Sequence, residues 1–401
     1  MSPPKTLKEK YLYNPNNYIV AVIFILSITS FFFLDISSLR NQSNAGDNDI
    51  FEAKVLEVIS ERDPTKQDIT FVTTLKVQEL LVEVPDGEST KRINITNDFS
   101  PVKTGNKIYV RASLFGEAGE SHEIVSIGRN RDLLLLAVFF GLLVLITTGI
   151  KGIKALVGLV FSFSVIFTYI VPQILSGANP VTVSLIGSSV ILIGTLYVTY
   201  GFNRKSTSAL IGISITLLFV GLLANFLVHG MNFTGASTEE ATFLTFAAKN
   251  TISLIGLLIA GIIIAAIGVL DDIAITQASV VAELVSTDPS LSKAQLFKKA
   301  MVLGKDHISA VINTLILAYT GASLPLVLLF FLGDYPMGYL VSNELIAEEI
   351  VRTLAASSGL VLAVPITTLV AVTLFKGNGV ALNESRDSLR SDGGHIGHHH
   401  G

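Results

Sequence analysis

The sequence predicts a membrane α-helical bundle of about eight transmembrane helices that carries one small extracytoplasmic all-β domain of the OB-like barrel type. Half of the 401 residues are hydrophobic and only 15% are charged, whereas a soluble protein carries about 25% charged residues. The charge deficit falls in long uncharged runs such as 133–150 and 251–270, each near the length that crosses a hydrocarbon core of about 30 Å. Residues 41–130 differ, because polar and apolar residues alternate there.

The N-terminal region predicts a signal anchor. Residues 1–17 are polar and carry Lys5, Lys8 and Lys10 ahead of the apolar run Tyr18–Leu34. A cleaved signal peptide is the alternative, but the run is long and no A-x-A cleavage site follows it. We therefore expect a transmembrane helix over 18–37 with the tail 1–17 in the cytoplasm.

Residues 41–130 predict five short strands. The alternating segments are separated by turn material, "RDPTKQD", "PDGEST" and "PVKTGN". They read "FEAKVLEVIS", "FVTTLKVQEL", "RINITND", "KIYVRAS" and "HEIVSIG". Five short strands in so few residues suit a small closed barrel, of which the oligonucleotide/oligosaccharide-binding (OB) topology is the commonest.

Residues 131–376 predict a seven-helix transmembrane bundle. The apolar runs are 133–150, 152–175, 181–200, 206–228, 251–270, 308–332 and 350–375. Helical patterning continues beyond Asp272 and before His307, so two of these helices are expected to extend past the bilayer. Ser292 with Gln295 forms a capping-box pattern, which predicts an interfacial helix leading into the sixth run.

The distribution of Lys and Arg predicts the orientation. These residues concentrate in 150–154, 201–205 and 271–305, whereas the intervening loops hold almost none. Both termini are therefore expected in the cytoplasm of a plasma-membrane protein. Residues 377–401 are polar and rich in Gly and Ser, which predicts a disordered tail. Its histidine-rich end, "GHIGHHHG", is expected to have no specific function, with metal binding as the alternative.

Composition and motifs also argue against several classes of function. A net charge of −4 without a basic stripe argues against nucleic-acid binding, and the lack of cysteine excludes disulfides and thiol chemistry. No G-x-x-x-x-G-K-[ST] loop is present, which disfavours a nucleotide-driven pump. We expect no cofactor and no enzymatic activity, and the lipid bilayer as a partner. Substrate, metal and oligomeric state stay open.

A first polar cluster lies in "GVLDDIAITQASVVAEL". Asp271 and Asp272 follow twenty uncharged residues, and the apolar pattern then resumes. Asp272, Thr276, Ser279 and Glu283 share one helix face. Charged groups at mid-membrane are costly, so they need a partner or a function. The alternative is that the span ends at Leu270 and both aspartates lie among the headgroups.

A second cluster lies in "GKDHISAVINTLILAYTGASLPL". Asp306, Ser309, Asn313 and Thr320 recur at helical spacing, and Asn313 is expected to hydrogen-bond to another helix. His307 is a candidate proton acceptor, with a structural hydrogen bond as the alternative.

A third cluster opens the last span. Glu348 and Arg352 are spaced i, i+4 and predict an ion pair, which an ordinary interfacial salt bridge would also explain. Glu349 and Thr353 share another edge of the same helix.

The two motifs quoted above and the third cluster's "NELIAEEIVRTLAASSGLVLAVPITTLVA" resemble the YibE/F family of bacterial multi-pass membrane proteins. The resemblance covers about residues 18–376 and implies an N-terminal anchor, an outer β-domain and a seven-span bundle. It implies architecture more than activity.

The "G-x-x-DD" motif with Glu283 eleven residues on is similar to a transmembrane helix of the RND transporters and SecDF proteins. That similarity implies that Asp271 and Asp272 carry protons. We further expect both to face Asp306, His307 and Asn313 on the next span. The chain departs from those proteins in having one small outer domain and no second copy of the bundle.

Three functions of different class follow. A proton-coupled secondary transporter would use the aspartates and the polar helix faces. A non-catalytic scaffold or sensor would present the outer β-domain. An intramembrane hydrolase is a distant third, because "EEIVR" has the wrong spacing for a CAAX-type protease and only His229 and His307 are available within the bundle.

Overall fold

The computed structural model describes residues 50–64, 76–86, 89–98, 100–114, 120–248, 251–333 and 335–376. The predicted anchor and both predicted tails lie outside these residues. The chain divides into two compact units, one from Arg40 to Gly149 and one that includes Ile150 onward, and each is described by itself.

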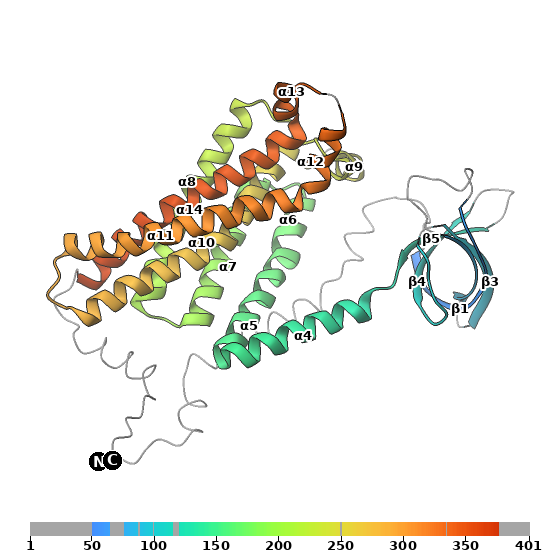
Figure 1. Cartoon of the computed structure of the whole chain (residues 1–401), viewed down its shortest axis with the longest axis horizontal. Helices are drawn as coiled ribbons and strands as arrows, with labels where there is room; N and C mark the ends of the chain where they lie inside the picture. Colours follow the sequence, from blue (N-terminus) through green and yellow to red (C-terminus); the bar gives the residue numbers. More distant parts are fainter. Residues whose placement is uncertain are drawn as a thin grey trace, which may run out of the picture. The chain divides into compact units, whose positions relative to one another are not determined.

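The first unit contains the predicted β-domain. Its five antiparallel strands are β1 (Ile50–Arg62), β2 (Val77–Asp86), β3 (Ser89–Asn97), β4 (Lys107–Leu114) and β5 (Glu120–Ile127). They pair in the order β3-β2-β1-β4-β5, and the edge strands β3 and β5 contact each other. The long central strand β1 has two register irregularities against β2, which let it curve as the sheet wraps around (Figure 1). The predicted OB-like barrel is confirmed as a fold class.

The barrel interior follows from the alternation of residues along the strands. Val55, Leu80, Val82, Ile108 and Val110 are fully buried and form its core. One predicted strand was misplaced: it was expected at 71–80, but β2 runs to Asp86, which pairs with Ser89. The alternation continues through "LLVEV", so the turn is shorter than the sequence "PDGEST" suggested.

A buried amide ties a loop to this barrel. The side chain of Gln78 is 2% exposed. Its Oε1 accepts hydrogen bonds from Val102 N at 2.8 Å and Asn97 Nδ2 at 3.0 Å, and its Nε2 donates to Val102 O at 3.1 Å and Glu61 Oε2 at 2.9 Å. Gln78 thus pairs with Val102 as a neighbouring strand would. Hydrogen bonds from Lys76 and then Gln78 hold the pKa of the Glu61 carboxyl below its ordinary value.

We expect Gln78→Leu to destabilise residues 46–128 expressed alone. Leucine has similar size but leaves Val102 N and Val102 O without their partner, at about 1–3 kcal/mol for each buried unsatisfied group. Urea unfolding followed by circular dichroism measures the loss. Glu79→Gln, an exposed neighbour on β2, is the control. Equal stability of both variants would contradict the role given to Gln78.

Seven helices among the described residues are long and apolar enough to cross a membrane, which confirms the seven predicted runs after the anchor. The first, α4 (Asn130–Thr148), belongs to the first unit. The second unit contains α5 (Ile150–Val165), the π-helix η2 (Ile166–Ile170), α6 (Val171–Leu175), α7 (Pro180–Tyr200), α8 (Arg204–Gly230), α9 (Glu239–Ala247), α10 (Leu254–Thr287), α11 (Lys293–Ala322), α12 (Leu324–Leu332), α13 (Met337–Ser342) and α14 (Glu344–Lys376).

Helix α11 differs from the expectation. The segment predicted as a separate interfacial helix is the first part of one continuous helix, which the predicted capping box of Ser292 and Gln295 begins. The helix ends at Ala322, so the predicted run 308–332 is interrupted at Ser323. Pro325 lies in the first turn of α12, where no helical hydrogen bond is lost.

Helix α10 is the centre of the bundle and packs against α7, α8, α11 and α14 (Figure 1). Glycines set two of the closest approaches. A Cβ added at Gly212 on α8 would lie 2.2 Å from Thr367 Oγ1 on α14, and one added at Gly256 on α10 would lie 3.1 Å from Pro180. Gly261 and Gly268 on α10 have nothing within 4 Å of an added Cβ.

The predicted orientation can be tested with single cysteines, because the chain has none of its own. Ser89→Cys and Ser342→Cys are expected to react with an impermeant thiol reagent added to intact cells, whereas Phe202→Cys reacts only after permeabilisation. All three positions are exposed. Reaction of Phe202→Cys in intact cells would contradict the orientation.

Candidate functional site

A buried amide on α10 hydrogen-bonds to two neighbouring helices of the bundle. Gln277 of α10 is 3% exposed, and its Nε2 donates to Ala300 O of α11 at 3.0 Å and to Thr368 Oγ1 of α14 at 2.7 Å. Gly304 lets α11 approach, because an added Cβ there would lie 3.1 Å from the amide. Sequence reasoning missed Gln277, since one polar residue on the apolar face of a long helix carries no spacing signal.

Asp271 lies on α10 before Gln277. It is half-buried, and its Oδ1 is shielded from solvent with no hydrogen-bond partner among the described residues. The preceding Leu270 packs next to Gly359 of α14. Tyr200, at the end of α7, lies within electrostatic range of both Asp271 and Asp272.

The depth of Asp271 follows from helix geometry. Gly256 lies beside Pro180, the first residue of α7, and the 21 residues of α7 cover about 31 Å. Asp271 comes fifteen residues after Gly256, or about 22 Å along α10. Measured along the helices, Asp271 therefore lies short of the level at which α7 ends.

The predicted polar stripe on α10 points outward. Asp272 and Glu283 are exposed, and Thr276 and Ser279 are half-buried. Ser279 Oγ donates to Ile275 O in its own helix at 2.6 Å. The buried face of α10 carries Gln277 instead, so the stripe does not line the interior of the bundle.

The polar residues predicted on α11 lie mostly on its outward face. Asp306 and Asn313 are exposed and His307 is half-buried, because α11 packs on the bundle through Leu296, Ala300, Gly304 and Leu315. One helix cannot turn both of these opposite faces inward. No hydrogen bond joins these residues to Asp271 or Asp272 among the described residues, and their part in a proton relay stays a prediction.

A second carboxylate cluster lies at the start of α14. Glu344 Oε1 accepts hydrogen bonds from Thr234 N, from Thr234 Oγ1 at 2.8 Å and from Gly235 N at 3.1 Å. Gly235 has φ of +70°, which turns these amides toward the carboxylate. Sequence reasoning missed this clamp because it joins residues more than a hundred positions apart.

Glu348, one turn further on, is 6% exposed. Its Oε2 accepts a hydrogen bond from Ser237 Oγ at 2.8 Å, and its Oε1 is buried with no partner among the described residues. Glu344 and Glu348 together hold the segment between α8 and α9 against α14.

The predicted Glu348–Arg352 ion pair is replaced by another. Arg352 Nη1 lies 3.4 Å from Glu349 Oε1, one turn earlier on α14. The predicted Glu349–Thr353 edge also forms, since Thr353 Oγ1 donates to Glu349 O at 2.8 Å. Tyr319 of α11 lies within electrostatic range of Arg352 and Glu349.

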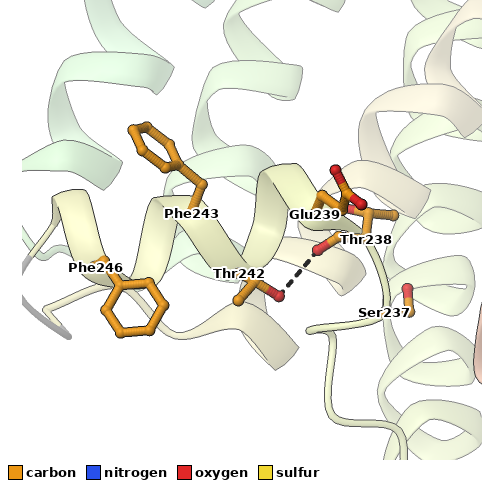
Figure 2. Close-up of a pocket in the computed structure, with 6 residues that line it drawn as sticks. All are labelled: Ser237, Thr238, Glu239, Thr242, Phe243 and Phe246. Carbon is orange, nitrogen blue, oxygen red and sulfur yellow. Dashed lines mark hydrogen bonds between the residues drawn. The ribbon is translucent and has the colours of Figure 1, made fainter. Parts of the chain in front are cut away.

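A shallow recess opens beside this cluster. It has a volume of about 480 Å³ and is lined by Ser237, Thr238, Glu239, Thr242, Phe243 and Phe246. Figure 2 shows Ser237 and Thr238 just before α9 and the other four residues on it, with Thr242 Oγ1 donating to Thr238 O at 3.1 Å. Phe243 and Phe246 are 72% and 76% exposed. Ser237 links the recess to Glu348.

Three buried hydroxyls accompany the two carboxylates. Ser188 on α7 and Ser357 and Thr367 on α14 have oxygens without a hydrogen-bond partner among the described residues. Such atoms in a bundle need water or a proton donor to offset their desolvation. Among the described residues, no group of three His, Cys, Asp or Glu side chains could hold a metal ion.

Comparison with known proteins gives one match. A family described as YibE/F-like protein matches residues 135–377, the region that holds both carboxylate clusters. No curated protein and no solved structure matches the chain. The similarity to RND and SecDF proteins is thus not supported by a match and stays a hypothesis.

Proposed function

The chain belongs to the YibE/F-like protein family, and from this premise we propose that it is a secondary transporter driven by a proton gradient. It is a multi-pass membrane protein with seven described helices able to span a bilayer. Proton coupling needs a group within the membrane that binds and releases a proton.

The observation that carries the proposal is the placement of Asp271. Its Oδ1 is shielded and lacks a hydrogen-bond partner among the described residues, about 22 Å along α10 from Gly256. An isolated ionised carboxylate in such surroundings is costly. Asp272 is adjacent, and a second negative charge nearby makes an ionised Asp271 more costly still. Asp271 is therefore the proton-binding residue in this proposal.

Glu348 supplies a second proton-binding group nearer the other end of the bundle. Its buried, unpartnered Oε1 has the same requirement for a proton. Ser357 follows nine residues later on α14, and Gly359 then packs beside Leu270, the neighbour of Asp271. The order Glu348, Ser357, Asp271 gives a polar route between the two carboxylates, with water completing the hydrogen bonds.

Proteoliposomes test the proposal. Vesicles that hold the protein and a trapped pH-sensitive dye are given an inward proton gradient, and candidate metals, amino acids and lipids are added in turn. We expect at least one class to accelerate proton entry and to accumulate against its own gradient. Proton entry no faster than in protein-free vesicles, with every class, would contradict transport and leave the scaffold or sensor function.

A further inference from the structure

Polar residues recur at helical spacing on the outward face of α11. Six of its exposed residues recur at alternating spacings of four and three: Val302, Asp306, Ser309, Asn313, Ile316 and Thr320. These residues, named here the outer seam, lie opposite the face that packs on the bundle. The alternation of four and three is the repeat by which two parallel helices pack along each other.

Asn313 is at the middle of this seam. Gly304, nine residues before it, contacts Gln277, and the helix ends at Ala322, nine residues after it. Asn313 is thus about 13 Å along the helix from either level. Asn313 therefore lies several residues inside the predicted apolar run 308–332.

The Asn313 amide has nothing to bind on its own bundle. Ser309 Oγ donates to Lys305 O at 3.0 Å and Thr314 Oγ1 to Ala310 O at 3.1 Å, each within α11. The Asn313 side chain is exposed and makes no hydrogen bond with any described residue. Hydrocarbon offers no donor or acceptor, so an amide facing lipid pays its full desolvation cost.

We propose that a second copy of this chain covers the outer seam, so that the protein is a homodimer joined through α11. Copies inserted in the same direction are related by a two-fold axis along the membrane normal, and this places their α11 helices parallel with Asn313 facing Asn313. An amide both donates and accepts, so two copies of Asn313 satisfy each other. A single Asn in such a seam also fixes the register of the two helices.

The charges at one end of the seam fit the same arrangement. Lys305 and Asp306 are adjacent and exposed. On a helix they lie about 100° apart, so the two-fold axis brings Lys305 of each copy to the side of the seam where Asp306 of the other lies. Opposite charges there favour association of like chains over repulsion.

Disulfide cross-linking tests the contact. Asn313→Cys and Ser309→Cys, each in the otherwise cysteine-free chain, are expected to give a covalent dimer on mild oxidation in membranes. Thr314→Cys is the matched control, because it is equally exposed but lies about 100° off the seam. Equal dimer from Thr314→Cys, or no dimer from any position, would overturn the proposal. So would an Asn313→Cys disulfide formed only with a cysteine placed in α4 of the same chain.

A second measurement tests how much the Asn313 amide contributes to dimer affinity. Fluorescence energy transfer between labelled copies diluted in lipid gives the dissociation constant. Asn313→Leu is expected to raise it about 3- to 30-fold, as for other interhelical side-chain hydrogen bonds, whereas Asn313→Gln keeps most of the affinity. Unchanged or tighter association of Asn313→Leu counts against the contact. The result is independent of transport, because neither variant alters Asp271.

Discussion

Replacing Asp271 with Asn is expected to reduce substrate-coupled proton entry to the rate of protein-free vesicles. Asparagine has the same shape, but its amide cannot bind and release a proton near neutral pH. The folded protein should remain, since Asp271 makes no described hydrogen bond that the change would break. Dye-loaded proteoliposomes measure the flux, and thermal stability in detergent measures the fold.

Two companion variants sharpen this result. Asp272→Asn changes an exposed carboxylate one residue away and is expected to retain more activity than Asp271→Asn. Glu283→Gln, about 18 Å further along α10 and exposed, is expected to behave as wild type. Full coupling in Asp271→Asn would remove the proton-binding role. A collapse of its stability would instead assign the carboxylate a structural role.

The fold was predictable from the sequence because its periodicities are strong. Uncharged runs of membrane-spanning length located all seven described spans, and the alternation around Val55, Leu80 and Ile108 located the barrel. Helix ends were less certain, since apolar residues continue through a break. Ser323 interrupts a run that hydropathy reads as one helix.

The candidate site was predictable only in part. Charge at the edge of an apolar run singled out Asp271 and Glu348, because charged residues within a membrane are rare and costly. Which face of a helix turns inward depends on its neighbours, so the spacing of Asp306 and Asn313 could not show that they point outward. Gln277 and Glu344 act through partners distant in the sequence, and no local pattern reveals such partners.

Gly212→Ala is expected to destabilise the bundle by about 1–3 kcal/mol, the usual cost of overpacking a close contact. A Cβ at this position would lie 2.2 Å from Thr367 Oγ1 and 2.9 Å from Thr367 Cα. Rotating the threonine side chain relieves the first contact but not the second, which involves backbone. Helices α8 and α14 must therefore move apart. This movement also disturbs the packing of Gly359 on α14 beside Leu270 on α10.

Gly261→Ala on α10 is the matched control for this change. Nothing lies within 4 Å of an added Cβ there, and alanine is favoured over glycine in a helix by about 0.5–1 kcal/mol. Heating each variant in detergent and measuring the fraction that stays monodisperse should show a lower midpoint for Gly212→Ala and an equal or higher one for Gly261→Ala. Because α14 carries Glu348 and packs against α10 beside Asp271, Gly212→Ala should also slow proton entry at temperatures where it remains folded. Equal midpoints for the two variants would show that the α8–α14 contact accommodates the added methyl group without loss of stability.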